Sequence, residues 1–197
     1  MERGNWKIKD KKAVYENPWI SLDHYEVIDP SGEDGIYGVV GFKNEALAIV
    51  PIDEQLHTYL VGQYRFPVDT YSWEVPEGGG ALKKSNKLEA LRELKEETGL
   101  IARDLYPFLE MQLSNSVTDE ISKSFVAFDL ETGDPQPDST EKITLLRVPL
   151  SDAFVMVEKN LIKDGLSVAS LMRLELILIK NKLTTYSQIK GWFTLPS

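Results

Sequence analysis

Acidic residues recur at helical spacing in residues 86–99, which read NKLEALRELKEETG. An α-helix turns by about 100° per residue. In a helix over this segment, the carboxylates would therefore lie within about one quadrant of the helix surface, at Glu89, Glu93, Glu96 and Glu97. The opposite side is mostly apolar, with Leu88, Ala90, Leu91 and Leu94. Each like-charged pair at this spacing costs roughly 0.2–0.5 kcal/mol, so we expect a bound cation to offset the repulsion. Oxygen ligands without Cys or His favour Mg²⁺ or Mn²⁺ over zinc or copper.

Both ends of this predicted helix carry capping signals. Asn86 is expected to be the N-cap, with Glu89 at the third helical position as in a capping box. Gly99 suits the left-handed residue that closes the last turn. Upstream, residues 76–80 (PEGGG) predict a tight loop whose bare backbone can approach a bound ion or phosphate. Loop and helix together therefore predict one site.

This segment resembles the Nudix box of the Nudix hydrolases. The matching residues stand at the spacing of that box: Gly78, Arg92, Glu93, Leu94, Glu96, Glu97, Gly99 and Leu100. The resemblance implies that Glu93, Glu96 and Glu97 bind the metal, with the carbonyl of Glu77 as a further ligand. At the seventh box position, where the family has a glutamate that supports the box arginine, this chain has Lys84. The alternative is a solvated helix held by ordinary ion pairs along one side.

The likeness continues upstream of the box. Residues 63–67 (QYRFP) and 73–78 (WEVPEG) resemble the segment that leads into the box in ADP-ribose and nucleotide-sugar pyrophosphatases. It implies that Arg65 contacts the diphosphate, a role suited to a guanidinium, and that Glu74 also belongs to the substrate site. In those enzymes the N-terminal strands exchange across a homodimer and form part of the base pocket. Trp19 is a candidate to stack on the base, because stacking suits any π face.

Two carboxylates compete for the role of general base. Residues 134–141 (DPQPDSTE) resemble the acidic loop that supplies the base in this subgroup. Where relatives carry the glutamate, this chain has Ser139, which leaves Glu141 as the nearest candidate. Glu96 is the other, and the sequence does not decide between them. A second departure is Asn115, which stands where the ADP-ribose subgroup has a proline.

The predicted reaction is metal-dependent hydrolysis of the diphosphate linkage in a nucleoside diphosphate sugar or in ADP-ribose. It would give a nucleoside monophosphate and a sugar phosphate. An alternative from another class is a Nudix-like sensor that binds such a ligand without cleaving it, although the three glutamates expected at the metal are all present. A third interpretation, cleanup of oxidised nucleoside triphosphates, is disfavoured by the N-terminal extension.

Hydropathy patterns predict the elements that position these residues. Alternating residues over 6–40 predict short antiparallel strands, with turns at 17–18, 29–32 and 34–35. Further strands are expected at 46–52, 57–65, 72–75, 109–113, 122–130 and 143–148. Helical spacing predicts helices at 152–159, capped by Ser151, and at 167–180. Strands followed by separate helices indicate an α/β sandwich, and the resemblance implies the Nudix α/β/α sandwich with a mixed sheet. We therefore expect an N-terminal strand element at 1–43 and a hydrolase domain at 44–197.

The composition excludes several classes of protein. The chain has 22 basic and 31 acidic residues and a net charge of −9, which disfavours DNA, RNA and anionic membranes as partners. It has no cysteine, so disulfides, thiolate catalysis and zinc–cysteine sites are excluded. No apolar stretch is long enough for a signal or a membrane span. We expect a cytoplasmic homodimer with a small nucleotide-sugar substrate and without a nucleic-acid or membrane partner.

Overall fold

The chain folds into two compact units. The computed structural model describes residues 1–82, 84–134 and 142–195. The first unit comprises Met1–Glu45 and Met111–Ser122, and the second comprises Ala46–Glu110 and Lys123–Ser197. The first unit thus joins the whole N-terminal strand region to a stretch from the middle of the chain. The domain boundary expected between residues 43 and 44 stays a prediction.

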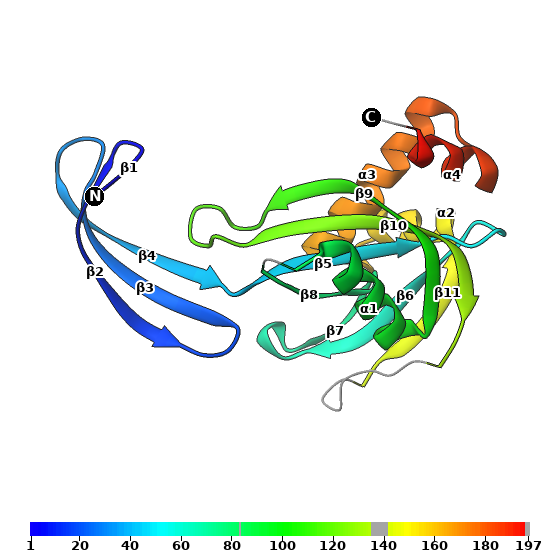
Figure 1. Ribbon diagram of the computed structural model, residues 1–197, viewed down its shortest axis with the longest axis horizontal. Coiled ribbons are helices and arrows are strands. Elements are labelled where there is room, and N and C mark those ends of the chain that lie inside the picture. Colours follow the sequence, from blue (N-terminus) through cyan, green and yellow to red (C-terminus); the bar gives the residue numbers. More distant parts are fainter. Residues whose placement is uncertain (83, 135–141, 196–197) are drawn as a thin grey trace. The chain divides into compact units, whose positions relative to one another are not determined.

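The first unit is built on a four-stranded antiparallel sheet in the order β1-β2-β3-β4 (Figure 1). Its strands are β1 (Glu2–Arg3), β2 (Trp6–Glu16), β3 (Ile20–Ile28) and β4 (Asp34–Phe42). The turn expected at 17–18 is confirmed, and Oδ1 of Asn17 stabilises it by accepting two backbone N–H groups at 2.8 Å. The turn expected at 34–35 is wrong, because both residues pair with β3 in the ladder.

Aromatic side chains of the first unit divide between its interior and its surface. Tyr25 is buried, and Trp6 meets Tyr37 edge-on with ring centroids 5.3 Å apart. By contrast, the side chains of Tyr15 and Trp19 are largely exposed. Tyr25, Trp6 and Tyr37 therefore pack within the unit, whereas Tyr15 and Trp19 present apolar surface.

The rest of the chain forms two further sheets, in the orders β8-β5-β10-β9 and β11-β6-β7. Their strands are β5 (Asn44–Pro51), β6 (His57–Arg65), β7 (Thr70–Glu74), β8 (Glu77–Ala81), β9 (Leu100–Gln112), β10 (Ile121–Thr132) and β11 (Thr144–Pro149). The helices of the described residues are α1 (Asn86–Thr98), α2 (Leu150–Glu158), α3 (Gly165–Asn181) and α4 (Tyr186–Thr194), with the short 3₁₀ helix η1 (Phe66–Val68).

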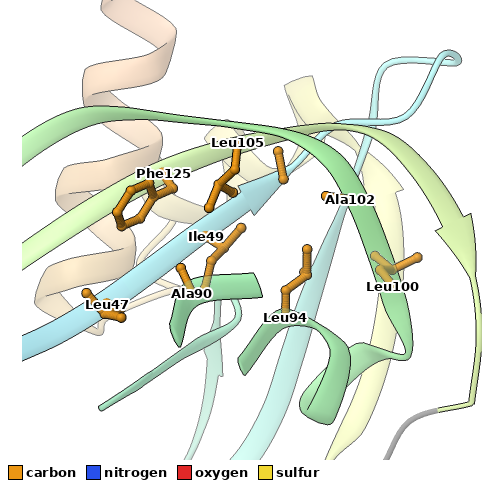
Figure 2. Close-up of a cluster of buried hydrophobic side chains, with 9 residues drawn as sticks. Leu47, Ile49, Ala90, Leu94, Leu100, Ala102, Leu105 and Phe125 are labelled. Atoms are coloured by element: carbon orange, nitrogen blue, oxygen red, sulfur yellow. The ribbon is translucent and has the colours of Figure 1, made fainter. Parts of the chain in front are cut away.

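Helices cover both faces of the β8-β5-β10-β9 sheet. On one face, Leu94 of α1 packs into a buried cluster with Ile49 of β5 and Phe125 of β10 (Figure 2). Neighbouring strand residues point to opposite faces, so Ser124 faces away from Phe125. The hydroxyl of Ser124 accepts a hydrogen bond from Ser170 of α3 at 2.7 Å, which places α3 on the other face. The α/β/α arrangement expected from the sequence is thereby confirmed.

The caps of α1 agree with the expectation at one end only. Gly99 closes the helix in the left-handed conformation, with φ of 74°, as expected. At the other end Ser85, rather than Asn86, is the N-cap, and its carbonyl accepts the first helical N–H groups. The expected capping box is wrong because the third helical position is then Leu88, and the carboxylate of Glu89 pairs with Arg92 instead.

Other expected elements also need correction. The glycine-rich segment before α1 is not a tight loop, because Glu77–Ala81 forms strand β8 beside β5. Leu88, expected on the apolar side of α1, is 67% exposed. Ser151 lies inside α2, whose N-cap is Pro149, and α4 was not expected. None of the helices in the described residues combines the length and the apolar character needed to cross a membrane.

Candidate functional site

Strand β8 lies directly against the glutamate-bearing side of α1. The backbone N–H of Glu77 donates to Oε2 of Glu97 at 2.9 Å, and Glu97 is buried. A Cβ atom on residue 78 would lie 2.2 Å from Cδ of Glu93, so Gly78 lets the strand pass close to this carboxylate. The structure therefore brings Glu77, Glu93 and Glu97 together, which are three of the residues expected at the metal.

Arg92 gathers carboxylates of α1 into an ion-paired group, here called the outer cluster (Arg92, Glu89, Glu93 and Glu96). Nη1 of Arg92 lies 2.5 Å from Oε2 of Glu96, and its Nη2 lies 2.5 Å from Oε1 of Glu93. Glu89 pairs with Arg92 at 3.2 Å and with Lys84 at 3.6 Å. Lys84, in place of the usual box glutamate, thus supports the arginine through Glu89 rather than by direct contact.

A second group, the inner cluster (Arg65, Glu74, Glu77 and Asp164), is more deeply buried. Arg65 donates from Nε to Oε1 of Glu74 at 3.0 Å and from Nη2 to Oε2 of Glu74 at 2.5 Å. It also donates from Nη2 to Oε1 of Glu77 at 2.8 Å. Burial by itself raises the pKa of Glu74, but hydrogen bonding to Arg65 acts against it and the pKa is lowered. Arg65 and Glu74 therefore persist as a charged pair.

Three carboxylates of the inner cluster face one another, because oxygens of Glu74, Glu77 and Asp164 all lie within 4.8 Å. Burial, followed by the charges of Asp164 and Glu74, raises the pKa of Glu77 well above its usual value. Oε2 of Glu77 is buried and has no hydrogen-bond partner among the described residues. The three carboxylates line a pocket of about 630 Å³ together with Arg65 and Lys163. A cation bound beside Arg65 would relieve the excess negative charge.

Asp164 was missed by the sequence reasoning. It is the N-cap of α3, where Oδ2 accepts the backbone N–H of Ser167 at 2.7 Å. An aspartate just before an apolar helical stripe is a recognised start signal, so this capping role was predictable. The position of Asp164 beside Glu74 and Glu77 was not predictable. Those residues lie about 90 positions earlier in the sequence, so the contact depends on the tertiary fold.

Trp19, Glu141 and Glu96 are the remaining predicted site residues. Trp19 belongs to the first unit, where it precedes β3 and is 66% exposed. Glu141, the candidate base from the acidic loop, lies outside the described residues. Glu96 lies in the outer cluster, with its side chain 38% exposed. The geometry therefore joins the α1 glutamates to β8, and Arg65 to Glu74 and Glu77.

Comparison with known proteins gives a consistent result. The model of the NUDIX domain matches residues 43–168 of this chain. The chain is 28% identical over 170 residues to the ADP-ribose pyrophosphatase of Bacillus subtilis (strain 168), covering 84% of this chain and 90% of that protein. It is 25% identical over 171 residues to the ADP-sugar pyrophosphatase of Mus musculus, covering 79% and 78% of the two chains.

The fold is also similar to that of a solved structure. A crystal structure of an ADP compounds hydrolase superposes with a TM-score of 0.80 at 23% sequence identity. The match covers 89% of this chain and 95% of the other. This likeness extends across most of both chains, so the overall fold is shared.

Proposed function

This chain belongs to the Nudix family, and we propose that it is a hydrolase that cleaves the diphosphate linkage of ADP-ribose or an ADP-sugar. The products are a nucleoside monophosphate and a sugar phosphate. The observation that carries the proposal is the junction of β8 with α1, where Glu77 donates to Glu97 and Gly78 passes against Glu93. Glu93 and Glu97 occupy box positions at which the family places its metal-binding glutamates.

The residues at this junction fit a divalent metal ion. Glu93, Glu96 and Glu97 would hold Mg²⁺ or Mn²⁺, with the carbonyl of Glu77 as a further ligand. The donor set is oxygen only, which these ions prefer, and Gly78 keeps the backbone free of a side chain that would displace Glu93. A bound divalent ion supplies neutralisation of the diphosphate charge and a more acidic water.

The residues of the chain supply orientation and proton removal. Arg92 orients the carboxylates of Glu93 and Glu96 through paired contacts at 2.5 Å. Removal of the proton from the attacking water falls to Glu96 or Glu141. The carboxylate of Glu96 is already occupied by its ion pair with Arg92 at 2.5 Å and by its expected role as a metal ligand. This consideration favours Glu141 as the general base.

Arg65 and Glu74 have different parts in substrate binding. The side chain of Arg65 is 37% exposed and lines the pocket beside the inner cluster, so its guanidinium can bind a diphosphate oxygen while Glu74 holds it in place. The side chain of Glu74 is only 2% exposed. We therefore assign Glu74 an indirect role, in which it orients Arg65 instead of touching the substrate.

The first unit is proposed to mediate a homodimer and to complete the base pocket through Trp19. Support comes from the exposed apolar surface of Tyr15 and Trp19, which a solvated sheet does not require. Replacing both residues by serine should shift the protein toward monomer in light scattering and raise KM for ADP-ribose. A double variant that stays dimeric with normal KM would contradict this role. The cytoplasmic location remains an expectation from composition.

A substrate panel tests the proposed function. ADP-ribose and several nucleoside diphosphate sugars are incubated with the protein and Mg²⁺, and the products are separated by chromatography. We expect a nucleoside monophosphate and a sugar phosphate from ADP-ribose or an ADP-sugar, and loss of this activity after exhaustive chelation. Tight binding of ADP-ribose without any product would indicate a sensor and contradict the proposal. Undiminished turnover after chelation would contradict the metal requirement.

A further inference from the structure

The connection between β7 and β8 is held by three different elements. It consists of Val75 and Pro76, which are both buried, and it leads into Glu77, the first residue of β8. The N–H of Val75 donates to Oγ of Ser167 on α3 at 3.0 Å. The carbonyl of Pro76 accepts from the N–H of Ile49 on β5 at 2.8 Å, and the N–H of Glu77 donates to Glu97 on α1 at 2.9 Å.

Ser167 accepts the hydrogen bond of Val75 from a well-defined position. It is completely buried in the first turn of α3, and its own N–H is bonded to the capping carboxylate of Asp164 at 2.7 Å. Buried backbone N–H groups are costly to leave without an acceptor. Loss of the Ser167 hydroxyl would therefore favour displacement of Val75, and with it of Glu77 two residues later.

That displacement would reach the metal-binding glutamates directly. Glu77 donates to Glu97, and Gly78 lies against Glu93. The contact between Gly78 and Glu93 leaves no spare volume, since even one added carbon would meet the carboxylate. A shift of the connection therefore changes the placement of both glutamates relative to the β8 backbone.

We propose that Ser167 is a positioning residue for the active site, which acts through the Val75–Glu77 connection to place Glu93 and Glu97. This inference rests on the proposed function, since it concerns the same metal-binding glutamates. It adds to that function a residue of α3, on the opposite side of the sheet from α1, that controls metal affinity without contacting metal or substrate.

Ser170 provides a matched control on the same helix. It is also completely buried, and its hydroxyl lies 2.7 Å from both Oγ of Ser124 and the carbonyl of Leu166. Those partners belong to β10 and to α3 itself. Ser170→Ala therefore removes a buried, hydrogen-bonded hydroxyl close to the site of Ser167→Ala without removing the acceptor of Val75.

The test is a Mn²⁺ titration followed by electron paramagnetic resonance on the full chain. The wild type, Ser167→Ala, Ser170→Ala and Glu97→Gln are compared, and amide hydrogen exchange of Glu77 is measured without metal. We expect Ser167→Ala to bind Mn²⁺ about 10-fold more weakly, as is typical when a group that orients a ligand is removed, and to exchange the Glu77 amide faster. Ser170→Ala should stay close to wild type in both measurements.

The outcomes separate this inference from the proposed function. If Glu97→Gln weakens Mn²⁺ binding while Ser167→Ala behaves like Ser170→Ala, the positioning role is wrong and the metal site stands. If Glu97→Gln binds Mn²⁺ as the wild type does, the proposed metal site is wrong. Should Ser167→Ala fail to fold, Ser167→Cys replaces it, because a thiol has similar size but is a weak acceptor. Wild-type Mn²⁺ affinity and Glu77 exchange in that variant would overturn the inference.

Discussion

The outer and inner clusters are both built on one arginine and three carboxylates, yet they differ in exposure and in origin. The outer cluster lies on α1 alone, and the side chains of Arg92 and Glu96 are 44% and 38% exposed. The inner cluster draws on β6, β7, β8 and the residue before α3, and the side chain of Glu74 is 2% exposed. Exposed carboxylates can exchange a partner for a ligand, whereas a buried pair that loses its partner is strongly destabilised. The outer cluster is thus suited to binding the metal, and the buried carboxylates of the inner cluster are suited to holding Arg65 in place.

Glu77 joins the two groups. Its carboxylate receives Arg65 in the inner cluster, while its backbone N–H donates to Glu97 beside the outer cluster. A disturbance of the inner cluster can therefore alter the metal site. A change in the outer cluster should have only a small effect on the stability of the fold. The predictions below test this division between the two clusters.

The largest contrast in stability is expected between Glu74→Gln and Arg92→Gln. Glu74→Gln leaves Arg65 without its buried partner and should lower the free energy of unfolding by about 3 kcal/mol. Arg92→Gln breaks exposed ion pairs and should cost about 1 kcal/mol or less. Urea unfolding of both variants measures the difference. Equal losses would remove the distinction between the two clusters.

A smaller contrast in stability is expected when either of two glycines of β8, Gly78 or Gly80, is replaced by alanine. A Cβ at Gly78 meets the carboxylate of Glu93, the flexible end of a side chain, whereas a Cβ at Gly80 lies 2.7 Å from Cδ1 of the buried Leu47. Gly78→Ala should therefore weaken Mn²⁺ binding about 10-fold with little change in melting temperature. Gly80→Ala should destabilise the fold by roughly 1–3 kcal/mol through overpacking. The opposite pattern would mean that β8 does not place Glu93.

The smallest effect is expected in the pH dependence of stability without metal. The folded-state pKa of Glu77 is raised above its ordinary value of 4.5, so the native state binds more protons than the unfolded state above that pH. The contribution of Glu77 to stability is therefore present below about pH 4.5 and is lost as the pH rises through its folded pKa. Glu77→Gln should remove this loss.

Urea unfolding in a chelator at pH 5 and at pH 8 checks this sign. Relative to the wild type, Glu77→Gln should gain stability as the pH rises. Glu74, whose pKa is lowered, has the opposite sign, because its contribution is lost as the pH falls through its folded pKa. A difference between Glu77→Gln and the wild type that does not vary with pH would show that burial and the neighbouring carboxylates do not raise the pKa of Glu77.

Sequence reasoning predicted that Glu89, Glu93 and Glu96 share one side of a helix because that geometry is local. The spacing of Glu89, Glu93 and Glu96 along one helix decides which side chains meet Arg92, and no knowledge of the tertiary fold is needed. The left-handed closure at Gly99 was predictable for the same reason. The N-cap was misassigned by one residue, since Ser85 and Asn86 carry equivalent capping side chains.

The inner cluster and the strand β8 depended on contacts between distant segments. Three successive glycines favour a loop by local preference, but pairing in the sheet with β5 makes residues 77–81 a strand. Asp164 and Ser167 reach the site only because α3 packs across the sheet from α1. The burial of Tyr25 was likewise not predictable from the sequence, since residues 111–122 belong to the same compact unit.

The central claim is that α1 holds the catalytic metal against β8, and Glu97→Gln tests it most directly. The variant keeps the size and the hydrogen-bonding oxygen of residue 97 but removes its charge. Steady-state hydrolysis of ADP-ribose is measured in excess Mg²⁺, well below the melting temperature, beside a thermal melt of the same sample. We expect kcat to fall by about 10²-fold or more with an unchanged melting temperature. Full activity in a variant with the wild-type melting temperature would place the metal elsewhere and contradict the account.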